Sequence, residues 1–172
     1  MAGMRGRQTV RDMVLSLAAI GAFAAVIYFV LPHDDTEKPP QKVDYQVELT
    51  TARRAAGYPV AAPEGLGKGW AATSVRFDGA AFKAWHLGFH GPDRTYVAVE
   101  QSTERPSRFI DRVTRGADET KLTQEIGGDR WRRYDGSDYD ALVLKEKGVT
   151  TVVTGPASRS ELTHVAERLK RS

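Results

Sequence analysis

The stretch FKAWHLGFHGPDRTYVAVEQ, residues 82–101, decides the fold class of this chain. It holds two runs in which apolar residues recur at every second position, namely Trp85, Leu87, Phe89, Val97 and Val99. Such alternation places one face of an extended strand in a core. Gly91, Pro92 and Asp93 lie between the two runs and are typical turn residues. We therefore predict two antiparallel strands, at residues 82–90 and 95–101, joined by a tight turn.

Further strands are predicted on both sides of this pair from alternation or from β-branched residues. They are residues 43–47, 70–77, 121–126, 130–134, 141–145 and 149–154. In residues 70–77 the alternation places Thr73, Val75 and Phe77 on one side of the strand. The last two strands form a hairpin around Lys147 and Gly148. Residues 60–69 are rich in proline, glycine and alanine, which predicts an irregular crossing.

Helices are predicted where caps coincide with helical spacing of apolar residues. A short helix at residues 52–56 is capped by Thr50 or Thr51, and a second covers residues 106–114. The last helix follows the capping box that begins at Ser158, and it turns one apolar face inward. That face consists of Leu162, Val165, Ala166 and Leu169. The sum is an α+β fold, an antiparallel sheet with helices packed on one face, preceded by one transmembrane helix.

The predicted transmembrane helix is Val14–Leu31, which reads VLSLAAIGAFAAVIYFVL and carries no charge. As a helix it spans about 27 Å, close to the ~30 Å hydrocarbon core of a bilayer. Arg5, Arg7 and Arg11 precede it, so we expect a cytoplasmic N-terminus and a domain outside the cell membrane. A cleaved signal peptide is the alternative, but cleavage after Ala24 would leave a very apolar new terminus.

These signals divide the chain into four parts. Residues 1–13 are the cytoplasmic N-terminus, and residues 14–31 are the transmembrane helix that contacts the lipid bilayer. Residues 32–42 are polar and contain three prolines, which predicts an extended extracytoplasmic linker. Residues 43–172 form the extracytoplasmic α+β domain.

Composition excludes several classes of protein. The chain has no cysteine, which rules out disulfides, a thiol nucleophile and a cysteine-ligated zinc site. Its 25 lysines and arginines nearly balance its 22 acidic residues, so the pI of about 9.2 indicates no nucleic-acid partner. The sequence also has no phosphate-binding loop, and no cofactor is predicted.

The sequence shows no local signature of a catalytic or metal site. On a strand rising ~3.3 Å per residue, His86 and His90 lie about 13 Å apart, too far to share a zinc ion. The serines Ser74, Ser102 and Ser137 stand outside any Gly-x-Ser-x-Gly elbow. We therefore assign no catalytic and no metal-binding residue. The acidic run Asp135, Asp138 and Asp140 lacks calcium-loop spacing and predicts a polar turn.

One segment is a candidate ligand-binding site because arginines alternate with aromatic residues. It comprises Arg130, Trp131, Arg132, Arg133 and Tyr134, and Trp85 is added as a further aromatic candidate. Arginines beside aromatic rings bind phosphates, anionic lipids or glycans. The alternative is that Trp131 is buried and the arginines are solvated.

Several short motifs occur in an order that resembles a known family. They are VRDMVLSL at residues 10–17, YPVAAP at 58–63, Gly69-Trp70, Trp131, and TTVVTGPAS at 150–158. The chain resembles the actinobacterial single-pass membrane proteins that carry domain of unknown function 4245. The resemblance implies membrane anchoring and brings no known activity or site residues.

Three hypotheses of function remain open. The favoured one is a noncatalytic extracytoplasmic module that binds an envelope component or a membrane-protein partner. The second is an envelope enzyme, which requires His86, His90, Asp93 or the serines to converge within hydrogen-bond reach. The third is a structural subunit of a membrane complex.

Overall fold

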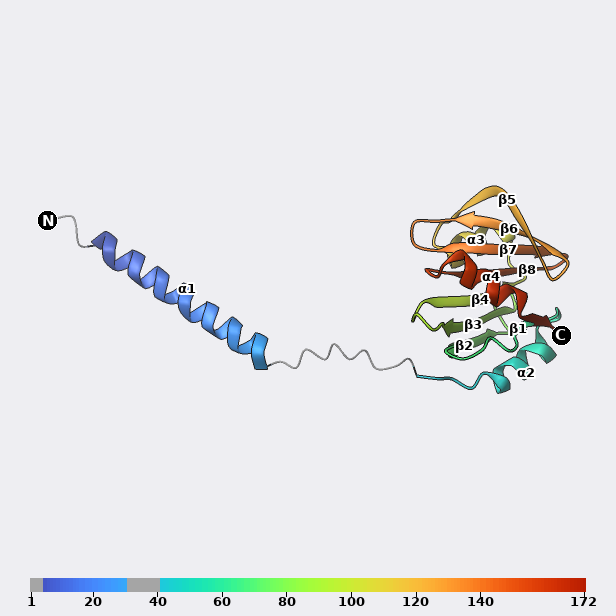
Figure 1. Ribbon diagram of the computed structural model, residues 1–172, viewed down its shortest axis with the longest axis horizontal. Coiled ribbons are helices and arrows are strands. Elements are labelled where there is room, and N and C mark those ends of the chain that lie inside the picture. The colour runs from blue at the N-terminus through green and yellow to red at the C-terminus, as the bar shows by residue number, and fades with distance from the viewer. Residues whose placement is uncertain (1–4, 31–40) are drawn as a thin grey trace. The chain divides into compact units, whose positions relative to one another are not determined.

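The computed structural model describes residues 5–30 and 41–172 and divides the chain into two compact units, Met1–Pro39 and Pro40–Ser172. The first unit contains helix α1, Arg5–Val30 (Figure 1). Its segment Val10–Tyr28 is long and apolar enough to cross a membrane, and none of it is buried. Exposed apolar side chains all along a helix suit a lipid environment rather than water. The predicted linker, residues 32–42, lies almost entirely outside the described residues.

The second unit is built on a seven-stranded antiparallel sheet with the strand order β2-β3-β4-β8-β7-β6-β5 (Figure 1). A separate antiparallel pair joins β1 to β9. The elements are α2 Gln46–Ala55, β1 Ala61–Pro63, β2 Ala71–Asp78, β3 Ala84–His90, β4 Tyr96–Ser102, α3 Pro106–Thr114, β5 Asp118–Ile126, β6 Asp129–Asp135, β7 Asp140–Glu146, β8 Val149–Gly155, α4 Arg159–Glu167 and β9 Leu169–Arg171. Every strand predicted from residue 70 onward is confirmed, with small shifts of its ends.

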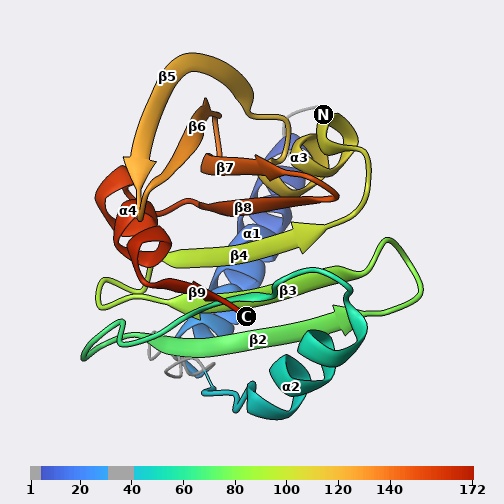
Figure 2. The same cartoon turned by 90° about the vertical axis from the view of Figure 1, so that its right-hand side faces the viewer.

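Helices cover both faces of the sheet. Helices α2 and α4 lie on one face, together with β9 (Figure 2), and α4 packs against Leu142 and Val153. Helix α3 packs against Val143 and Val152, which point to the opposite side. The α+β class is confirmed, but the expected placement of helices on one face holds only for α2 and α4. The reason is that β8 is buried along its whole length and needs an apolar cover on both sides.

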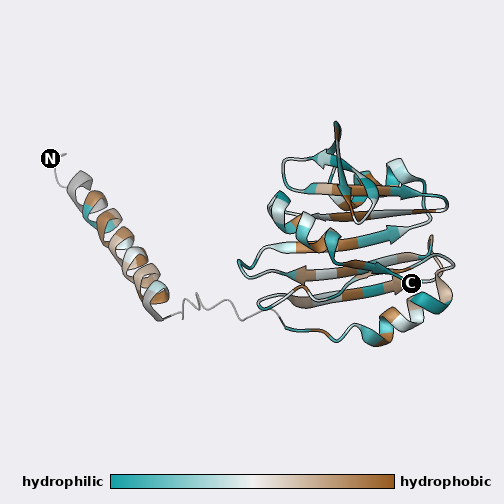
Figure 3. Cartoon of the chain, turned by 45° about the vertical axis from the view of Figure 1, so that its right-hand side comes forward, coloured by the Kyte–Doolittle hydropathy of each residue, from teal (hydrophilic) through white to brown (hydrophobic). Residues whose placement is uncertain are grey.

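The largest part of the core beneath α2 comes from the stretch that predicted the sheet. Trp85, Leu87 and Phe89 are 0 to 3% exposed and lie in one cluster with Leu49 and Ala52 of α2. The bands of apolar residues along the central strands are visible in Figure 3. Alternation in residues 82–101 therefore identified the core face correctly.

The predicted strand at residues 43–47 is wrong. Residues 41–45 have no regular structure, and α2 then begins at Gln46, well before the expected residue 52. Tyr45, Leu49, Ala52 and Ala56 recur at helical spacing, and all pack into the cluster beneath α2. This helical stripe outweighs the short alternation, because burying it requires a helix.

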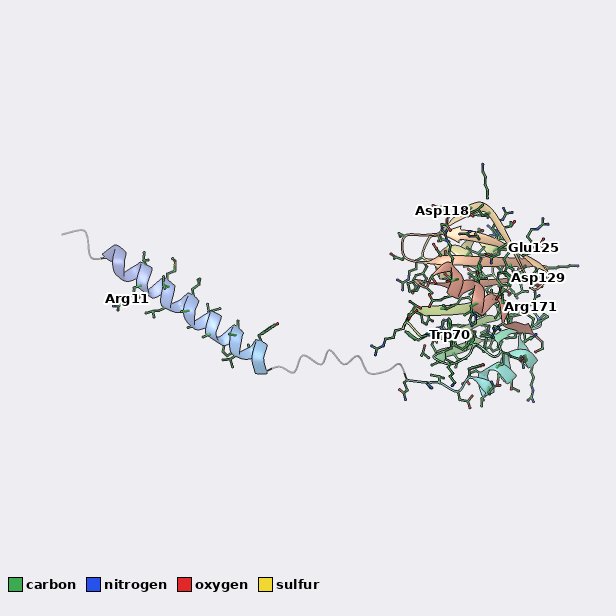
Figure 4. All side chains as sticks on the ribbon, in the orientation of Figure 1. Arg11, Trp70, Asp118, Glu125, Asp129 and Arg171 are labelled. Carbon is green, nitrogen blue, oxygen red and sulfur yellow. The ribbon has the colours of Figure 1, made fainter. Side chains whose placement is uncertain are left out.

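The C-terminal helix is confirmed at its start and differs at its end. Ser158 accepts a hydrogen bond from the Glu161 N–H, and the Glu161 side chain accepts one from the Ser158 N–H, which is the predicted capping box. The helix ends at Glu167, so Leu169 lies in β9 and not on the helix. Strand β9 pairs with β1, which lies in the predicted irregular crossing, and Arg171 of β9 is ion-paired with Asp129 (Figure 4).

Gln101 joins the two sheets from a position that is 0% exposed. Its side-chain oxygen accepts a hydrogen bond of 2.7 Å from the Ala61 N–H. Its side-chain nitrogen donates to Pro59 O at 3.2 Å and to Thr151 Oγ1 at 3.0 Å. A buried amide persists only when it is hydrogen-bonded, so Gln101 fixes β1 to β4 and β8.

The turn between β2 and β3 has an unusual backbone. Phe82 and Lys83 have φ angles of 53° and 48°, and a backbone hydrogen bond of 3.3 Å closes the turn around them. Such turns normally contain Asn-Gly, because other side chains are strained at positive φ. The Phe82 carbonyl accepts hydrogen bonds from the Thr103 N–H, the Thr103 hydroxyl and the Ser102 hydroxyl, which hold the turn in place.

Candidate functional site on the open sheet face

Strands β2, β3 and β4 have a second side, opposite the side that carries Trp85 and Leu87. We call it the open face, and its members are Ser74, Arg76, His86, Gly88, His90, Tyr96, Ala98 and Glu100. Helix α3 lies on the same side of the sheet, but over β7 and β8. The polar members are half-buried or exposed, whereas Gly88 and Ala98 are buried beneath them.

Ser74, His86 and Glu100 form a hydrogen-bonded chain across the three strands. Ser74 Oγ lies 2.9 Å from His86 Nε2, and His86 Nδ1 lies 2.6 Å from Glu100 Oε1. The Tyr96 hydroxyl oxygen lies 3.4 Å from both Ser74 Oγ and His86 Nε2. An ionised carboxylate only accepts, so the Nδ1–H donates to Glu100. In a neutral imidazole Nε2 then carries no proton and accepts from the Ser74 hydroxyl.

The sheet register explains why these side chains meet. His86 stands directly opposite Glu100 on β4, and Ser74 stands opposite Gly88, next to His86 on the same face. Gly88 leaves the space that the two hydroxyls fill. A Cβ atom at this position would lie 2.3 Å from both Ser74 Oγ and the Tyr96 hydroxyl oxygen.

A β-bulge after Ala72 adds Thr73 to the open face. Thr73 Oγ1 lies 3.0 Å from His90 Nδ1, whereas Val75 and Phe77 belong to the core side. The prediction that Thr73 shares a side with Val75 and Phe77 is therefore wrong. A bulge inserts one residue into the alternation, so the residues before it change side.

The electrostatics of the site keep its hydroxyl groups neutral. Burial raises the pKa of the Tyr96 hydroxyl, and its hydrogen bond with Ser74 offsets part of this rise. Tyr96 therefore remains protonated at neutral pH and is able to donate. The side chains of His86 and Glu100 are 23% and 16% exposed, so their contact is partly shielded from water. A hydroxyl bound to an imidazole, which is in turn bound to a carboxylate, is an arrangement able to remove the hydroxyl proton.

The enzyme hypothesis required convergence of histidines and serines, and Ser74 and His86 meet that condition, with Glu100 as the carboxylate. From the sequence, Ser74 and His86 are separate candidates, and nothing in the local sequence around Glu100 or Tyr96 indicates that they join them. The strand register could have identified Glu100. The turn after His90 places His90 opposite Tyr96, and His86 therefore stands opposite Glu100. Among the described residues, no group of three or more side chains is arranged to hold a metal ion.

The arginine-rich segment lies on β6 and divides its residues between two faces. Trp131 is 2% exposed in the core beneath α4, and Arg133 lies on the same side. Arg130, Arg132 and Tyr134 point to the other side. The sixth candidate, Trp85, is fully buried elsewhere and donates its indole N–H to Ala61 O at 2.9 Å. The six residues are thus not brought together, and ligand binding by them stays a prediction.

Several polar groups around β6 already interact with one another. Arg132 Nε lies 3.1 Å from Glu119 Oε1, and the Tyr134 hydroxyl donates to Glu119 Oε2 at 2.6 Å. Lys145 Nζ lies 3.4 Å from the same carboxylate. The hydrogen bond from Tyr134, with help from the two cations, holds the pKa of Glu119 below its ordinary value. These contacts indicate a cross-strand network between β5, β6 and β7.

A small cavity beside Arg133 and Asp135 has a volume of about 10 Å³. Arg133 Nη2 and Asp135 Oδ1 are buried there without a hydrogen-bond partner among the described residues. The volume is about that needed for one water molecule. Arg159 closes this region, with its nitrogens 3.1 Å from Asp135 and 3.4 Å from Asp140, so these carboxylates face a guanidinium group.

Comparison with known proteins places the chain in a family. Residues 5–169 match the family described as protein of unknown function (DUF4245). The chain belongs to this family. The DUF4245 match runs from the start of α1 to the start of β9, so it unites the apolar helix with the folded domain. No curated protein and no solved structure matches the chain.

Proposed function

We propose that this DUF4245 protein is a single-pass protein of an actinobacterial cell membrane that recognises an envelope component or a partner protein. Its N-terminus lies in the cytoplasm, residues 14–31 cross the bilayer, residues 32–42 form a linker, and residues 43–172 form the extracytoplasmic domain. The open face of β2, β3 and β4 is the recognition surface. The observation that carries the proposal is the cluster of polar side chains on a sheet face that lies beside, and not beneath, helix α3.

The proposed topology is supported by the residues around α1. Arg5, Arg7 and Arg11 precede the apolar segment, and positively charged flanks stay in the cytoplasm. The apolar side chains of α1 are exposed, for example 71% for Leu17 and 69% for Phe23, which favours contact with lipid.

The proposed recognition surface is supported by the composition of the open face. Aromatic and hydrogen-bonding groups lie side by side there, with the rings of His90 and Tyr96 5.4 Å apart and Arg76 exposed. Tyrosine and arginine are enriched where proteins bind partners. On β6, Trp131 is instead buried and Arg132 is held in an ion pair with Glu119, which favours the open face over that segment.

The topology can be tested with single cysteines, because the natural chain has none. Ser137→Cys places a thiol on an exposed residue of the domain, and Gln8→Cys places one before the span. We expect a membrane-impermeant maleimide to label the Ser137→Cys chain in intact cells and the Gln8→Cys chain only after permeabilisation. Labelling of Gln8→Cys alone in intact cells would reverse the proposed orientation.

Recognition by the open face can be tested with a photo-crosslinking residue. Arg76 is exposed on the open face, whereas Ser137 lies on an exposed turn elsewhere. We expect irradiation of intact cells to give a discrete adduct from position 76 that is absent from position 137. Identical patterns from the two positions would argue against a recognition role for this face.

A further inference from the structure

The chain formed by Ser74, His86 and Glu100 has the geometry of an activated nucleophile. Its two links measure 2.9 Å and 2.6 Å, and each uses a different nitrogen of the same imidazole. A nucleophile and base in direct contact, with the base held by a third group, is the arrangement found in serine hydrolases of unrelated folds.

The surroundings of Ser74 are compatible with attack on a substrate. Ser74 is half-buried on the open face, where its strand neighbour Arg76 is exposed to solvent. The Tyr96 hydroxyl, 3.4 Å from Ser74 Oγ, is a neutral donor next to the position where negative charge would develop on a substrate carbonyl oxygen. Gly88 keeps both hydroxyls close to the sheet, because any side chain at that position would displace them.

We propose that Ser74 is the nucleophile of an acyl-transfer site, with His86 as general base and Glu100 as the residue that positions His86. The substrate class is a carboxylic ester carried by a large molecule, because the site is a sheet surface and not a deep pocket of the kind that encloses small ligands. This inference goes beyond recognition, since it assigns a reaction to the open face.

The reaction balances with water as the only co-reactant. Ser74 Oγ bonds to the ester carbonyl carbon while its proton passes to His86 Nε2. The bond from that carbon to the alcohol oxygen then breaks, and His86 gives its proton to the leaving alcohol. Water next attacks the carbonyl carbon of the acyl group on Ser74, and His86 takes a proton from that water. The bond from the carbon to Ser74 Oγ then breaks, and His86 returns the proton to Oγ. The products are a carboxylic acid and an alcohol.

The proposal can be tested with a fluorophosphonate probe on the full chain solubilised in detergent. The probe forms an Oγ–P bond with an activated serine and releases fluoride, and mass spectrometry of peptides locates the labelled residue. We expect labelling of Ser74 with a rate that increases with pH in the range where imidazoles lose their proton. Ser137 is the internal comparison, because it is an exposed serine on a turn between β6 and β7.

Variants separate the three roles. Ser74→Ala should abolish the labelling, and Ser137→Ala should leave it unchanged. His86→Asn should slow it by about 10²-fold or more and remove its pH dependence. Glu100→Gln should slow it by at least about 10-fold yet leave a dependence on pH, because the imidazole base remains while the group that positions it is lost.

Gly88→Ala provides a variant without loss of any reacting group. It should reduce labelling by crowding the Ser74 hydroxyl, while tryptophan fluorescence shows the domain still folded. Labelling of Ser74 no faster than of Ser137, or a Ser74 rate unaffected by His86→Asn, would overturn the proposal. The detergent assay does not depend on membrane orientation or on a recognised partner, so its failure is distinguishable from failure of the proposed function.

Discussion

Replacing Gln101 by leucine tests whether one buried amide joins the two sheets. The change removes the hydrogen bonds to Ala61, Pro59 and Thr151. Ala61 and Thr151 are both 0% exposed, and a buried polar group that loses its partner costs about 1–3 kcal/mol. Leucine regains roughly 1–2 kcal/mol through its apolar surface. We therefore expect the free energy of unfolding to fall by about 2–4 kcal/mol, a large part of the 5–15 kcal/mol typical of a domain.

Urea unfolding of the detergent-solubilised chain, followed by tryptophan fluorescence, measures this change. The signal reports on the domain alone, since all three tryptophans lie in it: Trp70, Trp85 and Trp131. Gln124→Leu is the matched control, because Gln124 is half-exposed and its side chain makes one hydrogen bond, 3.2 Å to Thr163 Oγ1. The control should lose less than about 1 kcal/mol. Equal losses in the two variants would refute the role given to the buried amide.

Three further predictions concern stability. Gly155→Ala should lower the free energy of unfolding by more than about 3 kcal/mol, because the alanine Cβ would lie 2.1 Å from the Tyr96 carbonyl oxygen of β4. An unchanged midpoint of urea unfolding would contradict this. Phe82→Asn combined with Lys83→Gly should raise the melting temperature, because both residues have positive φ angles that favour Asn and Gly. The expected gain in the free energy of unfolding is about 1–2 kcal/mol. A lower melting temperature would show that contacts of the native side chains contribute more than the backbone strain costs. Glu119→Gln should reduce stability at neutral pH but not in acid. Because the pKa of Glu119 is lowered in the folded state, its ionised form stabilises the fold above the ordinary carboxyl pKa. This contribution disappears as the pH falls through the lowered pKa. A difference in stability between the variant and the natural chain that persists at about pH 3 would contradict this explanation.

The sequence predicted the large sheet well because strands such as β3 bury one face, which produces an alternating pattern. Trp85, Leu87 and Phe89 fall at every second position, and this spacing directly reflects the geometry of a strand. The errors occurred where the two-residue period of a strand and the helical period of apolar residues overlap, or where an element is very short. Residues 43–47 alternate, but Tyr45 and Leu49 also begin a helical stripe. Strand β1 has only three residues and exists because β9 pairs with it.

The candidate site was harder to predict because it depends on pairing between strands. Ser74 and Glu100 stand on β2 and β4, which do not pair with each other, so they meet only through His86 on the strand between them. Finding them together requires the register of two hairpins and the position of one bulge, and a bulge has no clear sequence signal here. The space above Gly88 is likewise visible only when β2 and β4 are placed on either side of β3.

The strand order has a consequence for how the domain forms during synthesis. Strands β2, β3 and β4 are consecutive in the chain, so the Ser74 region can assemble from contacts close in sequence, which form quickly. The other edge of β4 pairs with β8, which is synthesised only after β5, β6 and β7. Strand β4 therefore remains unpaired on that edge until β8 has emerged. In a chain that emerges from its N-terminus, the early meander carries unpaired backbone N–H and C=O groups along β4 for this interval. Shielding of that edge until β8 arrives is therefore a requirement of this topology.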